Sequence, residues 1–240
     1  MLFRNVLTAS LVLLLIILIQ SCGKVDPIED VISVTDYDSN SYKVVRIGNQ
    51  LWMAENHKTT HFNDGAIIPL VTDNPEWINN HLPGLCYYNN DLAAYKDTYG
   101  PLYNWYSVET GRLCPSGWHV PSDQEWARLS NYVGNKGGML KETGTNHWQS
   151  PNNSDNTSGF TALPGGYRKM YNGTFSDIGI TGYWSSSSLG EGHLSMGVRF
   201  YGPLVYVLNS MDDKVAKMDL SVALPFSGKS QGSSVRCVRD

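Results

Sequence analysis

The residues best suited to ligand binding lie in a polar stretch rich in asparagine. Asn152, Asn153, Asp155 and Asn156 place four amide or carboxylate groups within a few positions of each other. Such oxygens bind calcium or the hydroxyl groups of a sugar, although turns rich in asparagine also occur without any ligand. We take Asn153 and Asp155 as candidate ligand-binding residues. Calcium is the one cofactor that this pattern allows, and otherwise we expect none.

Aromatic rings are the second candidate group, because the chain contains 7 Trp and 14 Tyr. Rings stack on the apolar faces of sugars, often in a groove edged by amides. Trp148, Tyr171 and Trp184 lie in or beside loops rich in glycine and asparagine, so they are our candidates for ligand contact, the alternative being that they anchor these loops to the core. The remaining tryptophans that lie in strand or helix contexts are predicted to be core residues: Trp52, Trp105, Trp118 and Trp126.

One pattern typical of a catalytic site and one typical of a metal site are better explained as a turn and an extended segment. Residues 228–232 fit the Gly-x-Ser-x-Gly pattern of a hydrolase, but that motif requires a later histidine, and the last one in the chain is His193. We therefore predict a turn. His57 and His61 are four residues apart, a spacing that holds a metal only on a helix. Their neighbours favour an extended segment, so we expect no metal site there.

The first residues indicate export. Val6 to Ile19 form an apolar run preceded by Arg4 and followed by Cys22. The run is shorter than the roughly 20 apolar residues of a spanning helix. It resembles the lipobox of bacterial lipoproteins, with Gln20 as a departure, which implies lipid attachment at Cys22. Simple secretion and retention as a membrane anchor are the alternatives. We expect a lipid-anchored protein of a bacterial cell envelope, at the outer membrane or cell surface.

The domain organisation follows from this start. Residues 1–21 are the expected signal peptide, residues 22–41 a polar tether, and residues 42–240 a single domain. Residues 36–41 begin like a calcium loop, but Ser41 replaces the glycine of the sixth position, and Ile47 replaces the glutamate of the twelfth. We therefore assign residues 36–41 to the tether.

The cysteines predict one disulfide. With Cys22 assigned to lipid, Cys86, Cys114 and Cys237 remain, and outside the cytoplasm two of them should be oxidised. We predict a Cys114–Cys237 bond, which would stabilise the domain by roughly 4–5 kcal/mol in the chain-entropy model, and a buried free thiol at Cys86. The chain has no Cys-x-x-Cys spacing, which excludes a zinc knuckle and a dithiol redox motif.

Composition favours short strands and ordered loops over long helices. The chain is 41% hydrophobic and 17% charged, with 23 Gly. Its formal net charge of -4 and its lack of a Lys/Arg cluster argue against nucleic-acid binding. Apolar-rich runs at residues 42–47 and 50–53 flank Gly48-Asn49 and predict a hairpin. The spacing of apolar residues between Pro101 and Gly111 predicts a short helix. In the last third of the chain, apolar and polar residues alternate with a period of two, which is typical of antiparallel strands.

The strongest helix signal begins at Ser122. The side chains of Ser122 and Glu125 have the spacing of a capping box, and Gly134 is placed to end the helix. Trp126, Leu129 and Val133 fall on one face, which is the pattern of an amphipathic helix.

From about Val44 to Asp240 the chain resembles the Fibrobacter succinogenes major paralogous domain, a family of exported bacterial domains. Six blocks carry the resemblance in order: residues 47–56, 99–106, 114–126, 159–168, 182–187 and 234–238. The family in turn looks like a relative of formylglycine-generating enzymes and C-type lectins. The resemblance implies an α+β, C-type-lectin-like mixed fold, rich in loops, with short helices and twisted antiparallel strands.

This chain lacks the residues that carry the chemistry of formylglycine-generating enzymes and of C-type lectins. Formylglycine generation needs a pair of cysteines late in the domain, and only Cys237 follows Cys114. The calcium-binding triplets of lectins are also missing, since Ser185 and Ser186 follow Trp184. A fold by itself does not define a function. We therefore expect a non-catalytic module that binds a glycan or an envelope protein. The alternatives are an enzyme derived from the formylglycine-generating branch and a structural subunit of a surface assembly.

Overall fold

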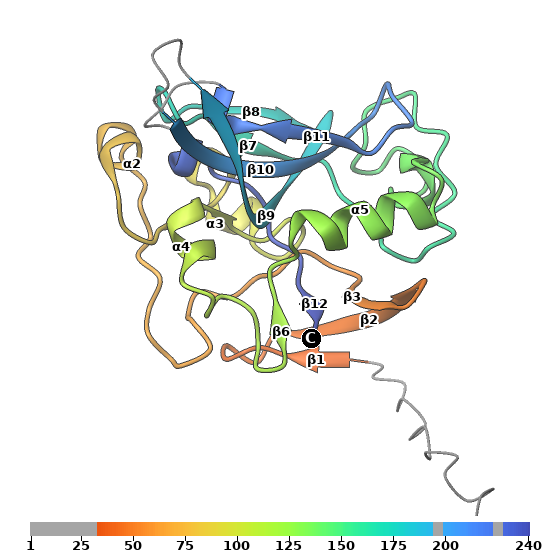
Figure 1. Cartoon of the computed structure of the whole chain (residues 1–240), viewed down its shortest axis with the longest axis horizontal. Helices are drawn as coiled ribbons and strands as arrows, with labels where there is room; N and C mark the ends of the chain where they lie inside the picture. Colours follow the sequence, from red (N-terminus) through yellow and green to blue (C-terminus); the bar gives the residue numbers. More distant parts are fainter. Residues whose placement is uncertain (1–32, 194–198, 223–227) are drawn as a thin grey trace, which may run out of the picture. The chain divides into compact units, whose positions relative to one another are not determined.

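The computed structural model describes residues 33–193, 199–222 and 228–240 (Figure 1). The expected signal peptide and Cys22, the expected site of lipid attachment, lie outside these residues. Within the described ranges, no helix is both long enough and apolar enough to cross a membrane.

The first sheet joins the start and the end of the domain. Its strand order is β1-β2-β3-β12-β6, all neighbours antiparallel. The strands are β1 (Ser33–Thr35), β2 (Ser41–Ile47), β3 (Gln50–Met53), β6 (Trp118–His119) and β12 (Val238–Arg239). The predicted hairpin is confirmed, because Ile47 pairs with Gln50 across a turn in which Gly48 has a φ of +61°. Positive φ is a conformation that glycine adopts at little cost.

Part of the expected tether belongs to the fold. The sequence predicts a polar tether over residues 22–41, whereas Ser33–Thr35 form β1 and pair with β2. The turn that follows is held by Asp36, whose backbone carbonyl and carboxylate both accept hydrogen bonds from nearby residues. Local carboxylate-to-backbone bonds of this kind stabilise turns without any metal.

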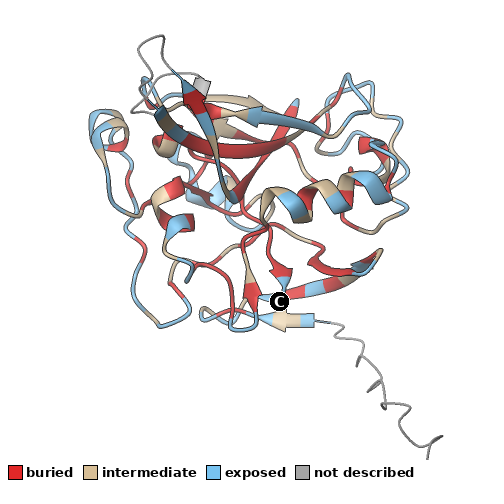
Figure 2. Cartoon of the chain, viewed as in Figure 1, coloured by how far each residue is buried: buried red, intermediate tan, exposed pale blue. Residues whose placement is uncertain are grey.

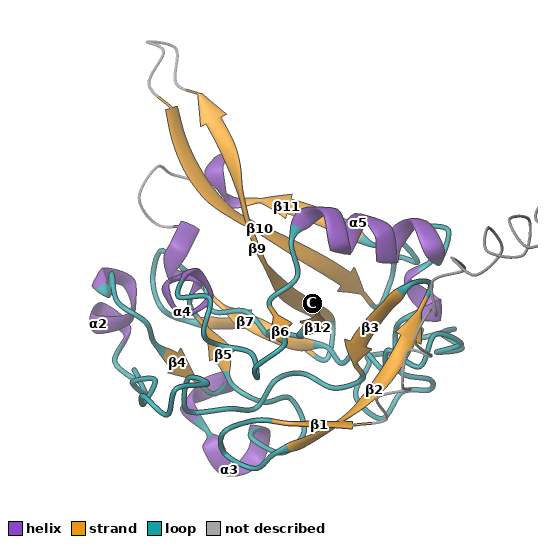
Figure 3. Cartoon of the chain, turned by 60° about the horizontal axis from the view of Figure 1, so that its bottom comes forward, coloured by secondary structure: helices purple, strands orange, loops and turns teal. Residues whose placement is uncertain are grey.

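The second sheet contains the longest strands. Its order is β11-β10-β9-β7-β8, and the β9–β10 hairpin extends well beyond its neighbours (Figure 3). Only the pairing of β7 with β9 is parallel in this sheet. The strands are β7 (Gly165–Arg168), β8 (Phe175–Ile178), β9 (Thr181–His193), β10 (Arg199–Asn209) and β11 (Ala216–Asp219). A third, two-stranded sheet pairs β4 (Leu85–Cys86) with β5 (Leu102–Tyr103).

The helices are short, as expected from the composition. The α-helices are α2 (Asn74–Asn79), α3 (Leu92–Tyr95), α4 (Trp105–Glu109) and α5 (Asp123–Tyr132). Single 3-10 turns occur at Tyr88–Asn90, Gly137–Met139, Leu220–Val222 and Gly228–Ser230. The capping box of Ser122 and Glu125 is confirmed. The predicted helix after Pro101 begins later than expected, because Leu102 and Tyr103 pair with β4 and the helix starts after the Asn104 cap.

The core lies where α5 meets both large sheets (Figure 2). The Trp126 ring stacks on Tyr206 of β10 at 4.9 Å and lies 5.0 Å from Trp52 of β3. The predicted Cys114–Cys237 disulfide is confirmed, with 6.0 Å between the Cα atoms, and Cys86 is a buried free cysteine. The chain is therefore a mixed α+β protein built mainly from antiparallel sheets.

Candidate functional site

Two of the aromatic candidates are core residues, and the expectation that they contact a ligand is wrong. Trp148 and Trp184 are each 1% exposed. The Trp148 indole donates to the carbonyl of Ala162 at 2.9 Å, and the Trp184 indole donates to Asn56 Oδ1 at 2.9 Å. A ring must expose a face in order to stack on a sugar. These rings instead anchor their segments in the core, which a loop-rich fold requires.

Two other candidates lie on the surface, separate from one another. Tyr171 is 57% exposed in the turn between β7 and β8. Asp155 is exposed, and its Oδ1 accepts from the backbone of Thr157 at 3.0 Å, as in an ordinary turn. The structure therefore does not gather the five predicted residues into one site.

Asn153, the fifth candidate, lines a cavity of about 310 Å³. The cavity lies between the loop that follows Lys141 and the turn that joins β10 to β11. Its polar lining residues are Lys141, Asn153, Ser154, Ser210, Asp212 and Asp213, and its apolar lining residues are Pro151 and Met211.

Lys141 fixes one wall of this cavity. The residue is 3% exposed, and its ammonium donates to the carbonyls of Asn209 at 3.0 Å and Asp212 at 3.3 Å. The same ammonium lies 5.4 Å from the centre of the Trp148 ring, which is a cation–π distance. Burial lowers the pKa of Lys141, while Asp213 and Asp212 oppose that shift. Lys141 therefore ties the β10–β11 turn to the buried Trp148 segment.

Further hydrogen bonds hold both cavity loops in place. Asp213 accepts from the backbone N–H of Gly138, and its own carbonyl accepts from Gly137 at 2.8 Å. On the opposite loop, Asn152 donates to the carbonyls of Glu142 at 2.8 Å and Gly144 at 2.6 Å. The cavity is therefore a preformed feature of the fold, as most small-ligand sites are.

Two lining side chains keep their hydrogen-bonding capacity free. Neither the Asn153 amide nor the Asp212 carboxylate makes a hydrogen bond to any other part of the chain that the structure describes. An amide has two donors and one acceptor oxygen, and a carboxylate accepts through both oxygens. These groups are available to a ligand.

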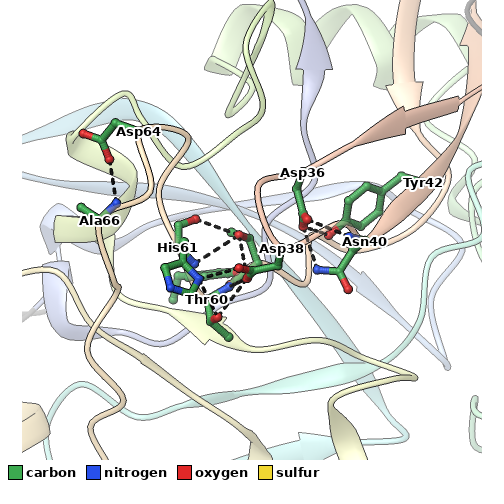
Figure 4. Close-up of polar contacts among 10 residues, drawn as sticks. Asp36, Asp38, Asn40, Tyr42, Thr60, His61, Asp64 and Ala66 are labelled. Carbon is green, nitrogen blue, oxygen red and sulfur yellow. Dashed lines mark hydrogen bonds and ion pairs between the residues drawn. The ribbon is translucent and has the colours of Figure 1, made fainter.

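The polar groups around Asp38 are arranged differently (Figure 4). Asp38 Oδ1 accepts from His61 Nδ1 at 2.5 Å, and Oδ2 accepts from the Thr60 backbone at 2.5 Å and hydroxyl at 2.9 Å. The Thr59 hydroxyl adds a fourth donor at 3.2 Å. Burial raises the pKa of Asp38, but the hydrogen bonds from Thr60 and His61 outweigh burial, so its pKa is lowered. We call these four residues the Asp38 network.

The neighbouring groups are equally committed to internal contacts. The Asp36 carboxylate accepts from the backbone and side chain of Asn40, both at 2.9 Å, and from the Tyr42 hydroxyl at 2.6 Å. His57 is buried and its Nε2 lies 2.8 Å from the carbonyl of Leu113. Burial lowers the pKa of His57 to about 4. The described residues contain no cluster of three or more His, Cys, Asp or Glu side chains that could hold a metal.

Sequence reasoning missed Lys141 and Asp212. One signal was available, since the polar turn from Ser210 to Asp213 follows an alternating strand. A lone lysine after a glycine-rich turn carries no comparable signal. Its contribution depends on contacts with residues about 70 positions later, such as Asp212.

The family is established by comparison with known proteins. The model of the Fibrobacter succinogenes major domain (Fib_succ_major) matches residues 45–239, so this chain belongs to that family. No curated protein and no solved structure matches the chain.

Proposed function

We propose that this chain is a lipid-anchored recognition module of a bacterial cell envelope that binds a hydroxyl-rich ligand, such as a glycan, in the Lys141–Asn153 cavity. The observation that carries the proposal is the free hydrogen-bonding capacity of Asn153 and Asp212 in a preformed cavity. Both side chains are exposed, so a ligand can reach them, and a preformed pocket with a few convergent polar groups is the usual form of a small-ligand site.

The chemistry of the lining favours a neutral polyhydroxyl compound. A sugar hydroxyl donates and accepts at once, which suits a wall that alternates ammonium, amide, hydroxyl and carboxylate groups. The cavity lining contains two carboxylates, Asp212 and Asp213, and one cation, Lys141, so its net negative charge disfavours an anionic ligand. Met211 and Pro151 offer apolar surface to the C–H face of a sugar ring. The ammonium of Lys141 also opposes calcium here, so we propose binding without a metal.

The fold and the location are further parts of the proposal. The two mainly antiparallel sheets that pack against one core helix support a relationship to C-type lectins and formylglycine-generating enzymes. The apolar run before Cys22 supports lipid attachment and placement at the outer membrane or cell surface. A protein partner of the envelope would use the same cavity.

The state of the cysteines supports binding over thiol chemistry. Cys114 and Cys237 are joined, so Cys86 is the one free thiol among the described residues. Burial raises the pKa of Cys86 to about 12, whereas a reactive cysteine requires an accessible thiolate.

The test is titration of the chain against a panel of polysaccharides by calorimetry, in the presence of a chelator. Asn153→Ala and Asp212→Asn are each expected to weaken binding about tenfold or more, which corresponds to about 1.4 kcal/mol. The matched control is Asp155→Ala, which changes an exposed residue outside the cavity. Glycan binding that survives both cavity changes would refute the site. If the chain binds an envelope protein and no glycan, and the cavity variants abolish that binding, the ligand is that protein.

A further inference from the structure

Large apolar side chains are exposed near the start of the domain. Tyr37 is 59% exposed, Ile67 is 72% exposed and Leu70 is 54% exposed. Their neighbours Ala66 and Pro69 are exposed as well. We call Tyr37, Ile67 and Leu70 the apolar patch. Exposed groups of large apolar side chains usually mark an interaction surface.

Two members of the patch, Tyr37 and Ile67, are tied to the Asp38 network. The Tyr37 ring lies 5.5 Å from the His61 ring, and His61 is hydrogen bonded to Asp38. Ile67 lies in a β-bridge with His61, so the Tyr37 turn and the Ile67 segment are side by side. The Tyr37 hydroxyl packs so closely on Gly65 that a Cβ there would lie 2.6 Å from it. The saturated network therefore presents apolar side chains outward.

The length of the preceding chain indicates what covers the patch. Residues 23–32 separate Cys22, the expected lipid-attachment residue, from Ser33, the first residue of β1. At full extension, the eleven residue steps from Cys22 to Ser33 span at most about 40 Å. A domain of this size is roughly 40 Å across. Tyr37 follows Ser33 by four residues, which is at most about 14 Å of chain.

We infer that the apolar patch rests on the surface of the lipid bilayer to which Cys22 is attached, with Tyr37 at the level of the headgroups. A tyrosine is suited to that boundary because its ring is apolar and its hydroxyl is polar. The inference rests on the anchor part of the proposed function. It adds an orientation, in which the domain lies on the membrane through a defined face.

The experiment measures amide hydrogen exchange on vesicles of phosphatidylethanolamine and phosphatidylglycerol. The chain from Cys22 to Asp240 is coupled through the Cys22 thiol to a maleimide-bearing phospholipid, because Cys86 is buried and the other two cysteines are disulfide bonded. This coupling makes the test independent of cellular acylation, which mass spectrometry of the exported protein tests separately.

We expect exchange in residues 36–40 and 61–71 to slow several-fold on vesicles relative to the free chain, with residues 209–218 unchanged. Ile67→Ser combined with Leu70→Ser is expected to remove this protection. The control pair, Leu189→Ser with Met218→Ser, removes exposed apolar groups from β9 and β11 and is expected to leave the protection intact. Equal exchange with and without vesicles in the wild-type chain, or protection that survives the patch variant, would overturn the inference.

Discussion

The Asp38 network and the Lys141–Asn153 cavity are both rich in polar groups, but those groups have different partners. In the network, each oxygen of Asp38 is occupied by donors from the chain itself. In the cavity, Asn153 and Asp212 face open space, while their neighbours hold the walls. The residue types are similar in the two regions. The difference shows that hydrogen-bond saturation, more than polarity, distinguishes groups that maintain the fold from groups available to a ligand.

This comparison predicts that changes to saturated groups lower stability and leave cavity binding intact, whereas changes to the free groups do the reverse. Four predictions test the first half.

The largest effect is expected at Arg168, which is fully buried. Its guanidinium donates to the carbonyls of Val71 at 2.6 Å and Gly173 at 2.8 Å and stacks on the Trp77 ring at 4.5 Å. Arg168→Met leaves several buried carbonyls without donors, so it should lower the free energy of unfolding by roughly 3–5 kcal/mol. Urea denaturation measures this loss. The exposed Arg128→Met on α5 is the control, with an expected change within about 0.5 kcal/mol.

The lowered pKa of the buried His57 predicts that the protein loses stability in acid. Burial lowers the folded-state pKa of His57 to about 4, below the ordinary value of about 6.5. The unfolded chain therefore binds the proton more readily, and stability is full above pH 6.5, falls as the pH drops to about 4, and then levels off. The loss is roughly 3 kcal/mol. Denaturation at a series of pH values should show a shallower decline in His57→Gln. An unchanged decline in that variant would contradict the assignment to His57.

Asp38→Asn should lower the free energy of unfolding by roughly 2 kcal/mol, because a charged acceptor of four hydrogen bonds becomes a neutral group with one acceptor oxygen. Asp64→Asn is the matched control, since Asp64 forms an exposed ion pair with Arg112. Solvent screens an exposed pair of this kind, so Asp64→Asn should leave the stability nearly unchanged. Glycan affinity should stay the same in both variants, and a loss of affinity in Asp38→Asn would break the distinction between the two regions.

The smallest effect is expected at His119, which contacts Glu125 at 2.9 Å and also Asp240. Burial lowers its pKa, but the two carboxylates outweigh burial, so the pKa of His119 is raised. Its stabilising contribution is therefore complete below about pH 6.5 and disappears as the pH rises through the raised folded-state pKa. Because the ring is more than a third exposed, the effect should stay below about 1 kcal/mol. Thermal melts of His119→Gln should lack this alkaline decline.

Local signals predicted the elements that depend on near neighbours. The Gly48-Asn49 hairpin and the Ser122–Glu125 capping box both involve residues a few positions apart, and the structure confirms them. Trp184 instead packs in a core cluster formed by distant segments, and its indole donates to Asn56, which lies 128 positions away. Glycine-rich surroundings suggested an exposed loop, but the long-range contact determined the outcome. The cavity was only partly predictable for the same reason, since two distant segments form its walls.

The central claim is that the free polar groups of the cavity bind the ligand while the saturated groups elsewhere serve the fold. The most direct test is to record the amide chemical shifts of the chain while it is titrated with a polysaccharide that the calorimetric panel has shown to bind. The account predicts shifts at residues 141, 153–154 and 210–213, with residues 36–40 and 57–61 unchanged. Shifts confined to the loop around Tyr171, or to the Asp38 network, would contradict it.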